Sequence, residues 1–406
     1  MRNGQFKNEK LNPNNPKWNE SIQRFSDIYS RSVDMRSEFS RDYNRILHSQ
    51  LYRRLRHKTQ VFFATRNDHI CTRMEHVTHV AAVSYTIANY LGLNTELTNA
   101  IAIGHDLGHA PFGHEGETRL KDLSENHLGT KFWHEGNGIY VCDYIGTLPD
   151  PKGFEQNMNL TYAVRDGIVS HCGEVKEDSI SPRNEYIDLY NITKPNQFQP
   201  FTWEACVVKI SDKISYLGRD IEDAIELKLL GKKQLLELRN IVKEIADIPR
   251  LNNTVLMHDL IVDLCNESNP QEGLRLSTKH LKLINSVKDF NIEYIYKHPR
   301  IEYYKKYSGL IINTLFETLK NLYDSKELDN ALNQNRINYP ELIRAFRAWL
   351  IKYSNLDLKV HNRKRFRNKI IYDIKSDKDY LKSIIDFIAG MTDSYAIKMY
   401  HEIISF

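Results

Sequence analysis

Apolar residues recur at three- and four-residue steps over most of the chain, which is the pattern of amphipathic helices. The first such ridge follows residue 38 and consists of Tyr43, Ile46, Leu47, Leu51 and Leu55. The segment TRMEHVTHVAAVSYTIANYLG carries His76 on its apolar ridge and ends at Gly92, a residue typical of helix C-caps. A third helix is expected to start with Asn94 or Thr95 as its N-cap, and Gly108 interrupts the pattern after it.

The rest of the chain continues this helical pattern. Further helices are predicted over residues 135–146, 160–171 and 203–230, and helical periodicity persists from residue 230 to the C-terminal end. Residues 179–200 contain three prolines and no steady period, so they are predicted to form a long loop or lid. Strands do not alternate with helices, which argues against a Rossmann-type sheet. The pattern therefore predicts an all-α fold.

The composition narrows the class of protein. The 406 residues are 41% hydrophobic and 27% charged, as in an ordinary globular protein, and the formal net charge of +4 does not by itself indicate nucleic-acid binding. Five widely spaced cysteines with no CxxC pair argue against a disulfide framework and a thiolate zinc site, and they fit a reducing cytoplasm. Residues 1–20 are polar and Asn-rich, which predicts a flexible arm rather than a signal peptide. No apolar run approaches the ~20 residues of a membrane span.

The segment AIAIGHDLGHAPFGHEGE, residues 100–117, concentrates three histidines and three carboxylates among glycines and a proline. Structural histidines do not need such an irregular backbone, so we interpret the segment as a metal site. Adjacent residues on a helix point about 100° apart, so His105 and Asp106 can reach one ion only where a helix ends. His76 on the preceding helix is expected to be a third ligand, although a hydrogen-bonded core histidine is the alternative there.

A fourth ligand is expected from the segment EACVVKISDKISYLGRDIEDAIE, residues 204–226. The segment has the pattern of a buried helix in which Asp212 needs a partner, whereas an exposed capping or ion-paired aspartate is the alternative. Tyr216 and Asp220 follow one and two turns later on the same face, with the cation of Lys213 beside it. A helix built only for a hydrophobic core would not normally align these groups.

The order His76, His105–Asp106 and Asp212 resembles the H…HD…D signature of the HD phosphohydrolase superfamily. The blocks RDYNRILHSQLYRRLRHKTQVF, TRMEH, HDLGHAPFGHEGE, SDKISYLGRDIEDAI and IAGMTDSYA resemble, in the same order, those of bacterial deoxyguanosine triphosphate triphosphohydrolases. This resemblance extends over about residues 36–400. It implies an N-terminal arm (1–35), an HD-domain helical core (36–235) and an α-helical C-terminal extension (236–406) that completes an all-α fold.

The resemblance also implies roles for individual residues. The implied metal ligands are His76, His105, Asp106 and Asp212. The implied catalytic residues are His114 with its acidic partner Glu117, His109 facing the phosphates, and His134, which matches an active-site histidine of the animal relatives. The implied substrate-binding residues are Arg73 and Lys213 for the triphosphate, and Gln60, Tyr216 and Asp220 for the deoxyribose. Tyr216 matches a position where a ribose 2′-hydroxyl would clash.

The family reaction is metal-dependent hydrolysis of a deoxynucleoside triphosphate such as dGTP, by water attack at the α-phosphorus, to a deoxynucleoside and inorganic tripolyphosphate. One divalent ion per subunit is therefore expected, and two histidines with two aspartates accept Mn²⁺, Mg²⁺, Fe²⁺, Co²⁺ or Zn²⁺. The relatives further imply a homo-oligomer, from dimer to hexamer, and two additional partners, an allosteric nucleotide and single-stranded DNA. No membrane partner is expected.

Two alternative functions remain open at this point. One is another HD phosphohydrolase that acts on a nucleoside monophosphate, a cyclic nucleotide or an alarmone. The other is a nucleotide-sensing or nucleic-acid-binding protein whose hydrolysis is vestigial. His171 and Glu174 either lie near the site or cap a helix end. The basic tract HNRKRFRNK, residues 361–369, is either a solvated face or a contact for the triphosphate, a regulatory nucleotide or single-stranded DNA.

Overall fold

The computed structural model describes residues 3–28, 34–62, 67–172, 179–245, 253–324, 326–356 and 365–405. Its α-helices are α1 (Trp18–Ser21), α2 (Glu38–His48), α3 (Gln50–Arg54), α4 (Arg73–Leu91), α5 (Thr95–Gly104), α6 (Gly113–Leu128), α7 (His134–Tyr140), α8 (Tyr162–Ser170), α9 (Trp203–Glu226), α10 (Lys232–Ile245), α11 (Asn253–Glu267), α12 (Thr278–Asn291), α13 (Pro299–Lys320), α14 (Leu328–Asn335), α15 (Pro340–Tyr353), α16 (Asp377–Ala389) and α17 (Asp393–Ile404). Two short antiparallel pairs accompany them, β1 (Thr147–Pro149) with β2 (Glu155–Asn157) and β3 (Ser179–Ile180) with β4 (Leu274–Arg275). The all-α prediction is confirmed. None of the described helices is long and apolar enough to span a bilayer.

Local capping explains where the helices around the HD motif begin and end. Thr72 forms a capping box with Glu75 at the start of α4, and Gly92 ends that helix with a φ of 85°. Asn94, one of the two predicted N-caps, accepts hydrogen bonds from two backbone N–H groups of α5. Because α5 ends at Gly104, His105 and Asp106 follow directly after a helix end, as the sequence predicts.

The remaining predicted helices are present with shifted ends. The helix predicted over 135–146 starts at His134 as α7 and continues as a π-helical turn over Val141–Ile145. The helix predicted over 160–171 is α8, and the one predicted over 203–230 is α9, which ends at Glu226. The GHEGE segment is helical, because α6 already starts at Gly113. The irregular backbone expected around all three histidines therefore covers only residues 105–112.

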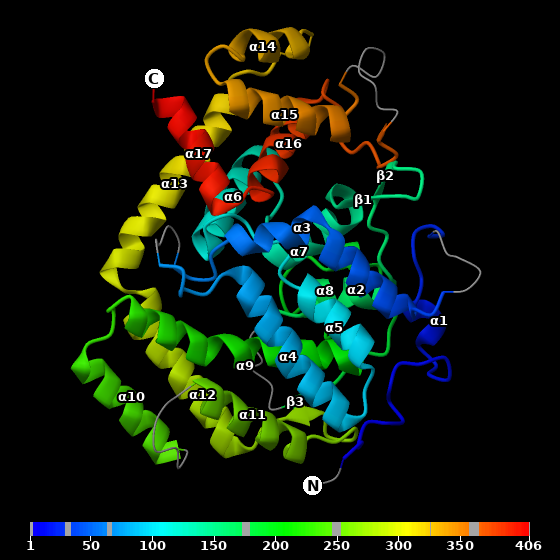
Figure 1. Ribbon diagram of the computed structural model, residues 1–406, viewed down its shortest axis with the longest axis vertical. Helices are drawn as coiled ribbons and strands as arrows, with labels where there is room; N and C mark the ends of the chain where they lie inside the picture. The colour runs from blue at the N-terminus through cyan, green and yellow to red at the C-terminus, as the bar shows by residue number, and fades with distance from the viewer. Residues whose placement is uncertain are drawn as a thin grey trace.

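Figure 1 shows two groups of helices joined by the long α13. Helices α9 to α12 lie together at one end, α14 to α17 lie at the other, and α13 runs along one side between them. Between the two groups, α4 packs against α5 and α9, and α5 packs in turn against α2 and α8. Helices α4 and α9, which carry His76 and Asp212, and α5, which directly precedes His105 and Asp106, therefore pack directly on one another.

The apolar core contains two large clusters and a third, smaller one, and each large cluster draws on distant parts of the chain. One large cluster contains Val80 of α4 together with Ile312 of α13, and the other contains Ile214 of α9 together with Leu260 of α11. Each large cluster thus has members on both sides of residue 235. The division into a core at 36–235 and an extension at 236–406 stays a prediction, and the packing across it is continuous.

The prediction of a flexible arm over residues 1–20 is wrong for residues 3–20, which are the described part of that segment. Phe6 is fully buried with its ring edge-on to Trp203, at a centroid distance of 4.8 Å. The backbone N–H of the buried Leu11 donates to Glu204 at 3.0 Å, and Lys17 donates to two backbone carbonyls near α9. Isolated apolar residues in an Asn-rich stretch have no periodicity, so the pattern did not show that they pack.

Residues 179–200 form the long loop that the sequence predicts, with only β3 and a 3₁₀ turn at Leu189–Asn191 as regular structure. The loop is anchored on α8, because Asp166 accepts hydrogen bonds from the guanidinium of Arg183 and from the backbone N–H of Phe201. A role for this loop as a lid stays a prediction.

Candidate active site

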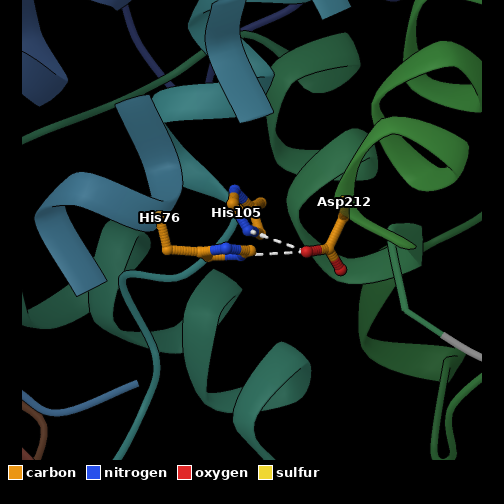
Figure 2. Close-up of side chains that lie close together, drawn as sticks. All are labelled: His76, His105 and Asp212. Carbon is orange, nitrogen blue, oxygen red and sulfur yellow. Dashed lines mark ion pairs between the residues drawn. The ribbon is translucent and has the colours of Figure 1, made fainter. Parts of the chain in front are cut away.

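The four predicted metal ligands converge where α4, α5 and α9 meet. His76 of α4 brings its Nε2 atom within 2.9 Å of Asp212 Oδ1 on α9, and His105 Nε2 lies 3.8 Å from the same oxygen. Figure 2 shows both imidazole rings directed at that oxygen from the opposite side of the cluster. Asp106 completes the group, with Oδ1 at 3.5 Å from His105 Nε2 and Oδ2 at 3.9 Å from His76 Nε2.

The donor atoms of this cluster fit a divalent metal ion. His105 Nδ1 lies 2.6 Å from the backbone carbonyl of Ala102, so we assign its ring proton to Nδ1. The other ring nitrogen, Nε2, is then an acceptor, and it is buried without a hydrogen-bond partner in the described ranges. Such a buried acceptor is costly unless a ligand pairs with it. His76, His105 and Asp212 offer ligand atoms that lie within 4.8 Å of one another, and imidazole with carboxylate is a donor set for transition metals.

The two aspartates of the cluster are ionised. Burial by itself would raise the pKa of Asp212, but the hydrogen bond and charge of His76 hold this pKa well below its usual range. Burial acts on Asp106 in the same way, and the hydrogen bond from His109 and the charge of Arg73 overcome it, so this pKa is also low. Arg73 Nη1 donates to Asp106 Oδ2 at 2.8 Å. Both carboxylates are therefore available as anionic ligands at neutral pH.

Glycine allows the loop after Asp106 to pack closely against α7. A Cβ atom on Gly108 would lie 2.2 Å from the carbonyl oxygen of His134 and 2.2 Å from the backbone nitrogen of Gly138. The Asn137 side chain fastens this contact by donating to the Gly108 carbonyl at 2.7 Å. Any larger residue at position 108 would push α7 and His134 away from the site.

The C-terminal part of the chain holds the other end of the same loop. Asp393 of α17 accepts the backbone N–H of Phe112 at 2.9 Å and that of Thr59 at 3.0 Å. The buried Lys58 donates to the carbonyl oxygens of His109 and Ala389. Burial lowers the pKa of Lys58 to about 7. The IAGMTDSYA block thus positions the HD loop from the far end of the chain.

A second cluster, formed by His109, His114, Glu117 and His134, lies beside the first. His109 stacks on His134 with ring centroids 3.9 Å apart. Both Glu117 oxygens lie 3.1 Å from His134 Nδ1, and Glu117 also accepts the backbone N–H of His134 at 2.8 Å. His114 Nδ1 lies 3.7 Å from Glu117, and the His114 side chain is 80% exposed. The structure therefore brings Glu117 closer to His134 than to His114, its predicted partner.

The residues of this second cluster differ in protonation state. Burial would lower the pKa of His134, but the charge of Glu135 and the contacts with Cys172 and Glu117 raise it well above its usual value. Burial would raise the pKa of Glu117, yet the nearby imidazole of His114 and the hydrogen bonds with His134 keep this pKa far below its usual range. Burial and the charge of Arg73 lower the pKa of His109. A neutral His109 is thus stacked on a cationic His134 that pairs with an anionic Glu117.

One cavity of about 490 Å³ connects both clusters. The predicted cations Arg73 and Lys213 line it. Three lysines that sequence reasoning missed also line it, namely Lys209 of α9, Lys288 of α12 and Lys305 of α13. Lys209 lies three residues before Asp212 on the same helix face, a spacing that the sequence does contain. Lys288 and Lys305 come from helices that no motif connects with the site.

Arg73 and Gln60 are among the lining residues that carry unpaired polar atoms. The Nε and Nη2 atoms of Arg73 and the Oε1 atom of Gln60 are buried without hydrogen-bond partners in the part of the chain that the structure describes. Two donors and one acceptor without partners in one cavity are typical of a site that binds an anionic, hydroxyl-bearing ligand.

Tyr216 and Asp220 both line the cavity, as the helical spacing predicts. Asp220 accepts a 2.5 Å hydrogen bond from the hydroxyl of Tyr296, which lies in the π-helical turn Ile292–Tyr296 and was missed by sequence reasoning. Burial raises the pKa of Asp220 to about 7.

His171, left open by the sequence, lines the cavity, with its ring edge-on to His105 at a centroid distance of 4.9 Å. Glu174 and residues 361–364 of the basic tract lie outside the described residues. In the rest of that tract, Arg367 stacks on Phe154 beside β2, away from the cavity lining. A nucleotide or DNA contact for the tract stays a prediction.

The chain is similar to known proteins along nearly its whole length. Residues 73–217 match the HD domain family, and residues 358–402 match the phosphohydrolase-associated domain family. A deoxyguanosinetriphosphate triphosphohydrolase-like protein of Rickettsia prowazekii (strain Madrid E) is 33% identical over 389 residues, which cover 91% of this chain and 92% of the relative. Proteins of the same description from Rickettsia felis (strain ATCC VR-1525 / URRWXCal2) and Rickettsia bellii (strain RML369-C) are 30% and 28% identical, with the same two coverages. The chain therefore belongs to the deoxyguanosinetriphosphate triphosphohydrolase-like family of HD-domain proteins.

Proposed function

We propose that this HD phosphohydrolase cleaves deoxynucleoside triphosphates, dGTP-like in class, to a deoxynucleoside and inorganic tripolyphosphate. One observation carries the proposal. A single cavity is lined by His76 and Asp212 of the metal cluster, by His134, which pairs with Glu117, and by a set of arginine and lysine cations. Each of these is needed for water to attack a phosphorus atom that is surrounded by negative charge.

The cations of the cavity are suited to a triphosphate. A nucleoside triphosphate carries about four negative charges, which must be offset before a nucleophile can approach. Arg73 offers two unpaired N–H groups beside the metal cluster, and Lys213 follows Asp212 directly on α9. Lys288 and Lys305 line the same cavity from α12 and α13.

A divalent ion on His76, His105, Asp106 and Asp212 would act as a Lewis acid on a phosphate oxygen. Hydrogen bonds with residues that do not bind the metal orient these ligands. Ala102 accepts the Nδ1 proton of His105, and Arg73 holds one oxygen of Asp106. Outer contacts of this kind fix the direction of the ligand lone pairs.

The leaving 5′-oxygen needs a proton, because an alkoxide is a poor leaving group. In the proposed reaction the water oxygen bonds to the α-phosphorus, the bond from phosphorus to the 5′-oxygen breaks, and His114 gives a proton to that oxygen. The anionic Glu117 orients His114, and the cationic His134 holds Glu117 in place. His109 faces the phosphates. The deoxyribose is held by Gln60, Tyr216 and Asp220, and the bulk of Tyr216 excludes a ribose 2′-hydroxyl.

Phosphorus NMR tests this reaction directly. The purified full chain with Mn²⁺ would be mixed with each dNTP singly and then with all four, beside an Asp212→Ala variant. We expect tripolyphosphate from the wild type and none from the variant, because the metal cluster loses the oxygen that both histidines approach. In ¹⁸O-labelled water the label should enter tripolyphosphate and not the deoxynucleoside, since the bond to phosphorus is the one that forms.

Other products would favour other functions. Pyrophosphate or orthophosphate would indicate another HD chemistry, and tight binding without turnover in any metal would indicate a nucleotide sensor. Tripolyphosphate that forms only in the mixture of dNTPs would add an activating nucleotide. A cytoplasmic location, a homo-oligomer and binding of single-stranded DNA stay predictions.

A further inference from the structure

His134 lies beside two carboxylates, those of Glu117 and Glu135. The proposed reaction gives a role to Glu117 but none to Glu135. The Nδ1 atom of His134 lies 3.1 Å from each oxygen of Glu117 and 3.4 Å from Glu135 Oε2. Glu135 is only 1% exposed, and both of its oxygens are buried without a well-formed hydrogen bond among the described residues. Within those residues only histidines form ion pairs with Glu117 and Glu135.

His109, which stacks on His134, has a ring nitrogen without a hydrogen-bond partner that could serve as a metal ligand. Its Nε2 atom contacts Asp106 Oδ1 at 2.9 Å, whereas its Nδ1 atom is buried and has no hydrogen-bond partner in the described ranges. His109, Glu117 and His134 offer one ligand atom each, and these three atoms lie within 4.8 Å of one another. The site thus presents two imidazoles and one carboxylate to a common point.

We propose that His109, Glu117 and His134 form a second metal site, separate from the His76–Asp212 cluster, that takes zinc and is inhibitory. Two histidines with one glutamate are a donor set that Zn²⁺ prefers in proteins. The buried carboxylate of Glu135 lies next to the site, at 3.4 Å from His134 Nδ1. A divalent cation would offset the charge of the Glu117 and Glu135 carboxylates, which within the described residues form ion pairs only with histidines.

The site must close slightly to bind. Tetrahedral zinc with bonds of about 2.0–2.1 Å holds its ligand atoms roughly 3.3 Å apart, and the three ligand atoms here lie within 4.8 Å of one another. The rings of His109 and His134 are nearly parallel, with an interplanar angle of 20°, so they must tilt toward each other.

Zinc at this place would stop the proposed reaction. It takes the position of the proton between His134 Nδ1 and Glu117, and that proton passes to solvent. Glu117 is then bound to the metal and no longer orients His114. Only this consequence for turnover rests on the proposed function, whereas the site itself can be tested by metal binding.

The test is the zinc stoichiometry of the full chain, without an affinity tag, dialysed against buffered free Zn²⁺ and measured by mass spectrometry of the metal. We expect two zinc ions per wild-type chain and one in Glu117→Gln, which keeps the shape of the side chain. His134→Asn should also bind one. The matched control is Glu125→Gln, an exposed position on the same helix, which should bind two. Circular dichroism confirms that each variant is folded.

A single zinc ion in the wild type would overturn the proposal, as would two in Glu117→Gln and His134→Asn, or loss of both ions in those folded variants. If the two-site stoichiometry holds, zinc that fills the second site should abolish tripolyphosphate release by the Mn²⁺-loaded enzyme. A protein that hydrolyses no dNTP in Mn²⁺ alone contradicts the proposed function and leaves the stoichiometry to decide the site.

Discussion

At the scale of single residues, the position of Glu117 decides how the site works. It lies near the start of α6, beside an exposed imidazole, His114, and a buried one, His134. Because its pKa stays far below neutrality, it is an anion throughout the physiological range. The Glu117 carboxylate can therefore orient the proton donor His114 and, at the same time, pair with the buried cation of His134.

Glu117→Gln should lower kcat by about 100- to 1,000-fold while KM for the dNTP changes little, because the amide cannot stabilise a protonated His114. The measurement is steady-state release of tripolyphosphate with Mn²⁺. Glu125→Gln on the solvent side of α6 is the control. A kcat near that of the wild type would show that Glu117 has no part in proton transfer.

Asp220 makes stability depend on pH. Its pKa is raised from 3.8 to about 7 by burial, so the folded state keeps a proton that the unfolded state releases above pH 4. The stabilisation from this group is full below pH 4 and is lost as pH rises to about 7. Asp220→Asn removes this dependence.

The free energy of unfolding of the wild type relative to Asp220→Asn should therefore fall by about 1–3 kcal/mol between pH 5 and pH 7. Urea unfolding of both proteins at the two pH values measures the change. A difference that does not vary with pH would mean that Asp220 titrates normally.

At the scale of elements, the HD loop is a short irregular segment held at both ends by helices from elsewhere. Gly108 lets α7 approach one end, and Asp393 of α17 holds Phe112 and Thr59 at the other. Phe112 itself has a left-handed φ of 65°, a conformation that costs energy for a residue with a side chain. The external hydrogen bonds offset that cost.

Asp393→Ala should lower the free energy of unfolding by about 3 kcal/mol, because it leaves buried backbone N–H groups unpaired. It should also lower kcat, since residues 106–112 lose one anchor. Urea unfolding and tripolyphosphate release measure the two effects. Ser394→Ala, at the next and exposed position, is the control. Full activity in a destabilised Asp393→Ala protein would separate the anchor from catalysis.

At the scale of the whole molecule, sequence-distant parts complete one another. The N-terminal residues pack on α4 and α9, and both large apolar clusters combine residues from before and after residue 235. The cavity also combines distant parts of the chain, since α12 and α13 contribute lysines to a site built on α4, α5 and α9. Stability and site geometry are therefore coupled across the chain.

Phe6→Ala should lower the free energy of unfolding by about 3–5 kcal/mol, because it removes a fully buried ring that packs on Trp203. Lys7→Ala, an exposed neighbour, should leave stability near the wild-type value. Urea unfolding compares the two. Equal stabilities would support the flexible arm that the sequence suggested.

Features that depend on local backbone physics could be predicted from the sequence alone. Helical periodicity, capping residues and the Gly-rich interruption predicted where α4, α5 and α9 lie, and therefore that His76, His105, Asp106 and Asp212 could meet. These predictions hold because a helix end and an i, i+4 face are properties of the backbone.

Tertiary structure alone decided the features that depend on which surfaces pack together. The pairing of Glu117 with His134, the burial of Glu135, the contributions of Lys288 and Lys305 and the burial of Phe6 all arise from contacts between residues far apart in the chain. No local pattern encodes such contacts, because each results from the shape of two surfaces rather than from the spacing of residues along one.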